Sequence, residues 1–426
     1  MIHRSSQRLE RNVTPPPQKG RGIARVFAWL PWPVVVVAAG VLVPTYAFAQ
    51  ANGDHNWVRM GLELIGGLAL FLLGIDQLSD GLRVAAGDQI KAILKRFTST
   101  WVTGAMTGAA ITALIQSSSV TTVLVVGFVS AGLMTLPQSI GVIFGANIGT
   151  TMTAQIAAFD IGKEALPLIA IGFLISVSVR SPVVRELGSA LLGLGLLFFG
   201  MEIMGDAMRP LRTYEPFLMV LQNLENPVYG IAMGAGFTAL IQSSSATTGI
   251  VIVMATSGVI TLPLGIAIAV GANIGTCATA GLASIGKSVD ARRAALVHIG
   301  FNVIGAALWI LFLDQLAALA VAISPDTPGL SGADKLAADA PRQIANANTL
   351  FNVINTIIFL PFASLFAAAA TRLIPGRAAA QGLSFPLKTG PEVYMLLAWQ
   401  REGWRWRGSG IQMRTFSICC GRSSWI

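Results

Sequence analysis

The stretch Thr112-Ala-Leu-Ile-Gln-Ser-Ser-Ser-Val-Thr-Thr122 occurs twice in this chain, since residues 238–248 read Thr238-Ala-Leu-Ile-Gln-Ser-Ser-Ser-Ala-Thr-Thr248. Ten of the eleven positions are identical, and the two copies are 126 residues apart. We call residues 112–122 the first motif and residues 238–248 the second motif. Because hydroxyls and amides are costly to bury in apolar surroundings, the repetition of this polar run indicates a functional site.

The composition is that of a membrane protein. Of the 426 residues, 54% are hydrophobic and 12% are charged, which is about half the charged fraction of a soluble domain. Apolar stretches long enough to cross a bilayer as helices recur along the chain. The sequence therefore predicts an all-α polytopic membrane protein. The net charge of +9 is concentrated in short loops and in both tails, as membrane topology requires, so no nucleic-acid partner is expected.

The repetition extends well beyond the two motifs. Residues 67–74 are echoed by residues 193–200, and Gly145-Ala-Asn-Ile-Gly-Thr150 recurs letter for letter at 271–276, again at an offset of 126. Such long internal symmetry is typical of transporters built from two related halves. We expect a first repeat at 58–185, a second repeat with its following span at 186–323, of which 294–323 is one span, and a final span at 344–376.

Loop charges predict that the two repeats are inverted. The loops 83–100 and 286–293 carry net charges of +3 and +2, whereas their partners 209–226 and 160–167 carry zero and −1. By the positive-inside rule the first two loops are cytoplasmic and the other two lie outside. Equivalent loops thus fall on opposite sides of the membrane.

This topology leaves too few residues for three full crossings between the loops 83–100 and 160–167. We therefore expect a re-entrant helical hairpin that carries Gln-Ser-Ser-Ser in each repeat, followed in the first repeat by a broken element around 137–151 in which the Gly-Ala-Asn-Ile-Gly-Thr glycines allow the break. Non-helical backbone is tolerated at membrane depth where it lines a cavity.

The two ends of the chain have a different character. Residues 1–50 combine a basic N-terminus with an apolar segment that ends Ala47-Phe48-Ala49-Gln50, which predicts either a signal peptide cleaved near Ala49 or an uncleaved anchor. Residues 377–426 contain four of the nine tryptophans and no apolar span. We interpret them as an atypical, disordered tail.

The motifs have the chemistry of an anion site. A helix that starts at the serines would direct its N-terminal N–H groups at one point, and such helix starts bind phosphate or carboxylate without a basic side chain. The residues predicted to bind the anion are Gln116, Ser117, Ser118, Ser119, Gln242, Ser243, Ser244 and Ser245.

Neighbouring hydroxyl and amide oxygens are the hard ligands that a small cation prefers. The residues predicted to bind the coupling cation are Thr121, Thr122, Asn147, Thr150, Thr247, Thr248, Asn273 and Thr276. The alternative is that these side chains only bond to their own helices or hold helices together. His298 and the asparagines of the later spans are interpreted in that way, as contacts between helices.

The paired Gln-Ser-Ser-Ser motifs, each followed by Gly-Ala-Asn-Ile-Gly-Thr, resemble the sodium-dependent phosphate cotransporter family, the type II sodium/phosphate symporters and their bacterial relatives. The resemblance covers about residues 60–375. It implies sodium-coupled transport of inorganic phosphate by alternating access, with both motifs lining the central site. Many bacterial relatives carry a soluble helical domain after the last span, and we expect no such domain in residues 377–426.

The sequence thus predicts a multi-pass symporter of the plasma (inner) membrane. Its partners would be phosphate, sodium and the lipid bilayer, and a homo-oligomer is left open. Neither a nucleophile–base pair nor a metal cluster is present, so we expect no enzyme activity and no cofactor apart from sodium as coupling ion. Two alternatives remain: transport of another anion, such as sulfate or a carboxylate, and a non-transporting membrane scaffold or sensor.

Overall fold

The computed structural model describes residues 57–86, 93, 97, 98, 100–159, 164–222 and 226–376, and every regular element in these ranges is a helix. Among the described residues, six segments are long and apolar enough to cross a membrane: Trp57–Ala86, Leu136–Ala157, Pro182–Thr213, Leu262–Ser284, Val289–Ile310 and Asp334–Leu373. The described part of this multi-pass membrane protein is all-helical. The predicted signal or anchor segment and the predicted tail at 377–426 lie outside the described residues.

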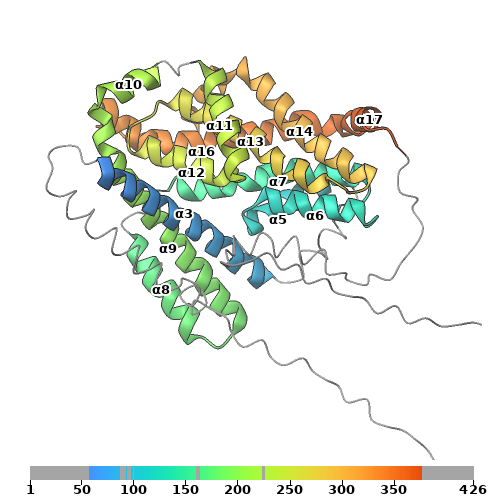
Figure 1. The fold of residues 1–426 in the computed structure, drawn as a ribbon, viewed down its shortest axis with the longest axis horizontal. Coiled ribbons are helices and arrows are strands. Elements are labelled where there is room, and N and C mark those ends of the chain that lie inside the picture. The colour runs from blue at the N-terminus through green and yellow to red at the C-terminus, as the bar shows by residue number, and fades with distance from the viewer. Residues whose placement is uncertain are drawn as a thin grey trace, which may run out of the picture. The chain divides into compact units, whose positions relative to one another are not determined.

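The helices reproduce the sequence repeat (Figure 1). The first copy comprises α3 (Trp57–Ala86), α5 (Trp101–Ile115), α6 (Ser118–Ser130) and α7 (Leu136–Ala157), and α8 (Ala165–Ser178) follows it. The second comprises α9 (Pro182–Met208), η2 (Arg209–Thr213), α10 (Glu215–Gln222), α11 (Pro227–Ile241), α12 (Ser244–Thr256) and α13 (Leu262–Ser284). The helices α11, α12 and α13 each begin 126 residues after α5, α6 and α7. The chain continues with α14 (Val289–Ile310), α15 (Leu313–Ala322), α16 (Gly332–Phe359), η3 (Leu360–Phe362) and α17 (Ala363–Leu373).

Equivalent helices α3 and α9 pack against each other in opposite directions. A Cβ atom added at Gly67 would lie 2.8 Å from the carbonyl oxygen of Gly200, and one added at Gly74 would lie 2.7 Å from that of Gly193. The contact partners thus move backwards along α9 as the chain advances along α3. Gly193 and Gly200 are the repeat equivalents of Gly67 and Gly74. The contact of Gly67 with Gly200 is therefore equivalent to the contact of Gly74 with Gly193.

Within each repeat, the helix before the break packs closely along the Gly-Ala-Asn-Ile-Gly-Thr helix. Gly145 of α7 lies against the backbone of Ala105 of α5, and Gly271 of α13 lies in the same way against Ile231 of α11. In both pairs the helices run in the same direction, because Gly149 and Gly275, one turn further on, meet Ala109 and Ala235. The two Gly-Ala-Asn-Ile-Gly-Thr segments therefore form packing surfaces for the helices that precede the breaks.

The prediction that the element at 137–151 is broken was wrong, since α7 is continuous and so is its counterpart α13. Asn147 donates to the carbonyl of Ile143 at 3.0 Å, and Thr150 donates to that of Ala146 at 3.1 Å. These polar groups are satisfied along their own helix, and the glycines provide close approach rather than a kink.

The predicted single span 294–323 is instead two helices, α14 and α15. The chain turns at Leu311 and Phe312, where the Leu311 and Phe312 amides donate to carbonyls only three residues back. Asp314 then lies in the first turn of α15, where the helix dipole favours a carboxylate.

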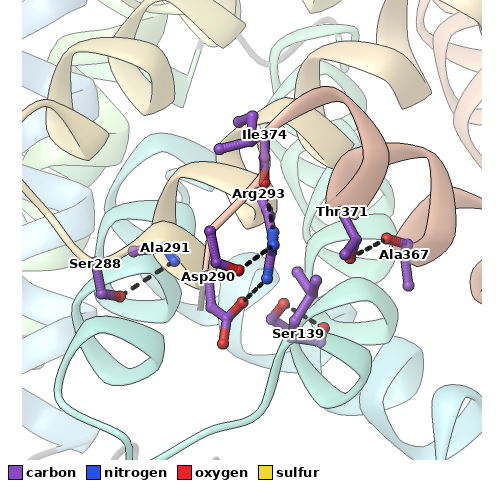
Figure 2. A network of polar contacts seen from close by, with 10 residues as sticks. Ser139, Ser288, Asp290, Ala291, Arg293, Ala367, Thr371 and Ile374 are labelled. Carbon is purple, nitrogen blue, oxygen red and sulfur yellow. Dashed lines mark hydrogen bonds and ion pairs between the residues drawn. The ribbon is translucent and has the colours of Figure 1, made fainter. Parts of the chain in front are cut away.

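A buried arginine joins the start of α14 to the end of α17 (Figure 2). The guanidinium of Arg293 donates to Asp290 Oδ1 at 2.6 Å and to the carbonyls of Ile374 and Gly376 at 3.1 Å each. Its side chain is only 5% exposed. Because carbonyls at a helix end lack intrahelical partners, this cation satisfies acceptors that would otherwise be left open, and it holds α17 against α14.

The glycine packing leads to a first prediction. Gly145→Ala would bring its new Cβ to 2.6 Å from the carbonyl carbon of Ala105, and overpacking of this kind costs about 1–3 kcal/mol. Gly127→Ala on α6, where nothing lies within 4 Å of the added Cβ, is the matched control, and there alanine favours a helix by about 0.5–1 kcal/mol. We expect thermal unfolding in detergent at a lower temperature for the first variant only. Equal melting temperatures would refute the close packing.

Candidate functional site

Both motifs break a helix at the same residue. Helix α5 ends at Ile115, Gln116 takes a left-handed conformation with φ of 59°, and α6 begins at Ser118. In the second motif Gln242 has φ of 56° between α11 and α12. They are the only residues other than glycine with positive φ in the described ranges. A left-handed glutamine is uncommon, so its occurrence at both equivalent positions points to a purpose.

The first serine of each motif caps the helix that follows. Ser117 Oγ accepts from the Val120 amide at 3.3 Å, and Ser243 Oγ accepts from the Ala246 amide at 3.2 Å. Each cap satisfies one of the free N–H groups at a helix start. The other serines, Ser118, Ser119, Ser244 and Ser245, are buried in the first turns of α6 and α12.

Two threonines brace each break from inside. Thr112 and Thr121 hydroxyls are 2.9 Å apart in the first motif, and Thr238 and Thr247 hydroxyls are 2.6 Å apart in the second. Thr121 and Thr247 also donate to the carbonyls of Ser117 and Ser243, both at 3.2 Å. The hydroxyls of Thr121 and Thr247, predicted as cation ligands, are thus engaged in holding the break. Thr122 and Thr248 are buried beside them.

The two motifs meet at one hydroxyl. Thr153 of α7 donates to Gln116 Oε1 at 2.8 Å, and Ser245 Oγ of the second motif donates to Thr153 Oγ1 at 3.4 Å. All three side chains are buried. The chain of bonds Gln116–Thr153–Ser245 therefore joins the break of the first repeat to the start of α12 in the second, although the motifs are 126 residues apart.

The repeat-related hydrogen bonds, from Thr279 to Gln242 and from Ser119 to Thr279, are not formed. Thr279 corresponds to Thr153, and its buried Oγ1 has no hydrogen-bond partner. Gln242 corresponds to Gln116, yet Gln242 is exposed whereas Gln116 is 5% exposed. The tip of the first break is also held by α3, because Ser79 Oγ donates to the carbonyl of Ile115 at 3.0 Å. Two nearly identical motifs thus stand in different environments.

The other predicted cation ligands lie along α7 and α13. Asn147 Oδ1 accepts from Asn302 of α14, and Asn273 bonds with Asn348 and Asn352 of α16. Thr150 and Thr276 donate back to their own helices. Among the described residues no three His, Cys, Asp or Glu side chains gather to hold a metal ion. Any cation held here would therefore have neutral oxygen ligands.

Comparison with known proteins identifies the family. The family model described as Na+/Pi-cotransporter matches residues 70–206 and 213–323, which include both motifs and the helices that carry them. The chain belongs to the Na+/Pi-cotransporter family. Family membership supports phosphate transport, which the sequence analysis inferred from the resemblance of the motifs, and a multi-pass membrane location, which the apolar helices predicted. It also makes a transporter rather than an enzyme the expected class.

Named relatives of this Na+/Pi-cotransporter family member come from bacteria and mammals. The protein is 32% identical over 311 residues to "Uncharacterized protein YqeW" of Bacillus subtilis, covering 73% of this chain and 97% of the relative. It is 26% identical over 302 residues to "Putative inorganic phosphate export protein YjbB" of Escherichia coli, covering 71% of this chain but only about half (53%) of that protein. A segment of 97 residues is 38% identical to "Sodium-dependent phosphate transport protein 2A" of rat, 22% of this chain and 15% of that one. No solved structure matches the chain.

The sequence analysis did not predict two residues that the structure places at the motifs, Thr153 and Ser79. Neither residue lies in a motif or in the other repeated segments quoted above. A signal for Thr153 was present, because Thr153 and Thr279 are themselves repeated at an offset of 126, three residues after each Gly-Ala-Asn-Ile-Gly-Thr segment. Ser79 had no such signal, since its counterpart is Gly205.

Proposed function

We propose that this chain couples sodium to the transport of inorganic phosphate across the plasma (inner) membrane by alternating access. The observation that carries the proposal is the meeting of both motifs at Thr153, which places two capped helix starts with buried serine hydroxyls around one polar region. Helix starts of this kind bind phosphate through backbone N–H groups and the helix dipole. In this proposal phosphate contacts Gln116 to Ser119 and Gln242 to Ser245.

Inverted repeats and re-entrant hairpins belong to the same proposal. The antiparallel packing of the equivalent helices α3 and α9 supports inversion. Helices α5 and α6 have 15 and 13 residues, so the longer one rises by roughly 22 Å. The apolar core of a bilayer is about 30 Å thick, so neither helix is long enough to cross it. Both therefore suit a hairpin whose tip, at Gln116 and Ser117, lies inside the membrane.

Sodium is the proposed coupling ion, and uptake is the proposed direction. Sodium is supported by the family description and by the buried neutral oxygens of α6, α7, α12 and α13. A cation would offset the negative charge of phosphate, because neither motif contains a basic residue. Relatives named for phosphate export make the opposite direction a specific second candidate. Transport of a different anion, such as sulfate or a carboxylate, is the other alternative function, because hydroxyls and helix starts select weakly among oxyanions.

Radiolabelled phosphate uptake into proteoliposomes tests the proposal. We expect uptake to require an inward sodium gradient and to fall by at least about tenfold, the effect of losing 1.4 kcal/mol, in the double variant Ser118→Ala with Ser244→Ala. Ser139→Ala, a buried serine of α7 outside both motifs, is the control and should transport normally. Uptake without a sodium gradient would contradict sodium coupling, and strong competition by sulfate would favour the other anion. Efflux from loaded vesicles under the reversed gradient tests the direction.

The asymmetry between the motifs predicts how alternating access works. In the opposite-facing state we expect Thr279 to bond Gln242 and Ser119, as Thr153 bonds Gln116 and Ser245 here. Thr153→Val then removes a bond of the present state and should lower its stability by about 1–3 kcal/mol, the cost of leaving a buried acceptor unpaired. Thr279→Val removes no bond here and replaces a buried, unpartnered hydroxyl by a methyl group, so it should not lower the melting temperature and should still slow phosphate uptake.

Two measurements on the same purified variants decide this prediction. Thermal unfolding reports on the resting state, and initial uptake rates report on the whole cycle. A normal uptake rate for Thr279→Val would mean that the second link never forms. A lowered melting temperature for that variant would mean that Thr279 is already bonded in the resting state.

A further inference from the structure

A cavity outside both motifs lies where the end of α7 meets α16 and the segment between α15 and α16. Its volume is about 220 Å³, and it is lined by Ala158, Phe159, Pro325, Thr327, Ala338 and Arg342. We call it the Arg342 cavity, because this half-buried arginine is the one charged side chain among the described residues that line it. The space is sufficient for a small anion together with several water molecules.

The guanidinium of Arg342 is held in place but has unused donors. Its Cζ lies over the ring of Phe159, 4.1 Å from the ring centroid, and Nη1 donates to the carbonyl of Gln155 at 3.3 Å. A guanidinium has five N–H donors, and this side chain forms no other hydrogen bond and no ion pair within the part of the chain that the structure describes. Most of its donor edge is therefore open to a ligand.

The acidic residues beside the cavity are bound to other groups. Asp339 Oδ1 accepts from the amide of Thr327 at 3.1 Å and from its hydroxyl at 2.7 Å, and Asp339 Oδ2 pairs with Lys335 at 2.9 Å. Lys335 pairs with Asp326 as well. These carboxylates fold the segment before α16 onto the start of that helix, and the positive charge of Arg342 has no carboxylate partner in the described ranges.

Polar side chains continue from the cavity toward the motifs. Asn346 and Thr349 follow Arg342 at intervals of four and three residues, so the three share one face of α16. Both accept from Gln155 Nε2 of α7, at 3.0 Å and 2.9 Å. Gln155 comes two residues after Thr153, where the two motifs meet. At 1.5 Å per residue, the cavity lies roughly 8 Å along the axis of α7 from Thr153.

We propose that the Arg342 cavity is an entry site, which binds inorganic phosphate before the anion reaches the motifs. The choice of phosphate rests on the proposed function, whereas the site rests on an open guanidinium in a cavity. Arginine binds phosphate through paired N–H···O bonds.

An arginine at this distance complements the motifs, neither of which contains a basic residue. A positive charge in a cleft raises the local concentration of an anion and its rate of association, and here it does so without holding the anion at the central site. The loop charges put the segment 160–167, which follows α7, outside the membrane. In that topology the entry site faces the outside, which suits uptake.

Initial rates of uptake into proteoliposomes, measured against phosphate concentration, test the entry site. Arg342→Gln should raise the KM for phosphate by about three- to tenfold and leave the maximal rate and the sodium dependence unchanged, because the motifs are intact. Arg342→Lys keeps the charge but not the paired donors, so it should recover part of the loss. Arg209→Gln is the matched control, since Arg209 lies in a loop of the same predicted side and pairs with Asp206 at 3.0 Å. Its KM should equal that of the unaltered protein.

Phosphate binding without transport separates the entry site from the proposed function. In the purified full chain carrying Ser118→Ala with Ser244→Ala, we expect the phosphorus NMR signal of inorganic phosphate to broaden in the absence of sodium. Adding Arg342→Gln to that chain should remove the broadening, and adding Arg209→Gln should not.

Three results would overturn the entry site: a lower maximal rate with an unchanged KM in Arg342→Gln, an equal rise in KM in Arg209→Gln, or broadening that survives Arg342→Gln. The first of these would mean that Arg342 only holds α16 against α7. Broadening that depends on Arg342 in a protein without sodium-driven uptake would instead count against the proposed function and leave the entry site standing.

Discussion

In the proposed hairpins a helix is broken inside the membrane, where its free backbone groups can be satisfied only by the protein, and the structure depends on how it meets this constraint. Water is absent from the apolar core, so each unpaired N–H or C=O there costs several kcal/mol. The motifs supply the partners from within. The serine caps the new helix, the threonine pair closes the gap behind it, and the second of these threonines bonds the carbonyl of the capping serine. What remains free at the tip, the first N–H groups of α6 and α12, is the part that can bind a ligand.

Each break must be held in a fixed position against the rest of the protein, and the glycines of α7 and α13 provide this support. They let α5 and α11 lie almost in backbone contact with a continuous helix over several turns. The second helix of each pair contacts both repeats: α6 packs on α7 and on α13, and α12 packs on α13 and on α7. Each break is thus supported by helices of both repeats. The contact of α12 with α7 is what brings Ser245 to Thr153.

The sequence alone predicts the features of the fold that depend on residues close together in the chain. Helix starts at the serines of both motifs follow from the polar run and its repetition at an offset of 126, because capping acts over a few residues, whereas the left-handed turn at Gln116 and Gln242 was not predicted. It failed where the same residue types serve two purposes. Glycine next to asparagine can break a helix or pack one closely, and α7 does the latter because Asn147 finds a carbonyl four residues back. Thr153 and the pairing of Asn302 with Asn147 depend on contacts between helices far apart in the chain, which no local pattern encodes.

In the proposed alternating-access cycle the two nearly identical motifs are arranged in two nearly equivalent ways, in which either repeat holds its tip closed. The structure has the first tip buried and the second exposed, and the sequence contains a reason for this preference. Ser79 of α3 bonds the carbonyl of Ile115, whereas the equivalent residue of α9 is Gly205, which has no side chain and contacts Ser257 at the end of α12. One such hydrogen bond contributes about 1 kcal/mol. In the proposed cycle, a difference of that size favours the present arrangement as the resting state without preventing the other. In the proposed transporter, sodium and phosphate binding must then supply only a small free energy to exchange the roles of the two repeats.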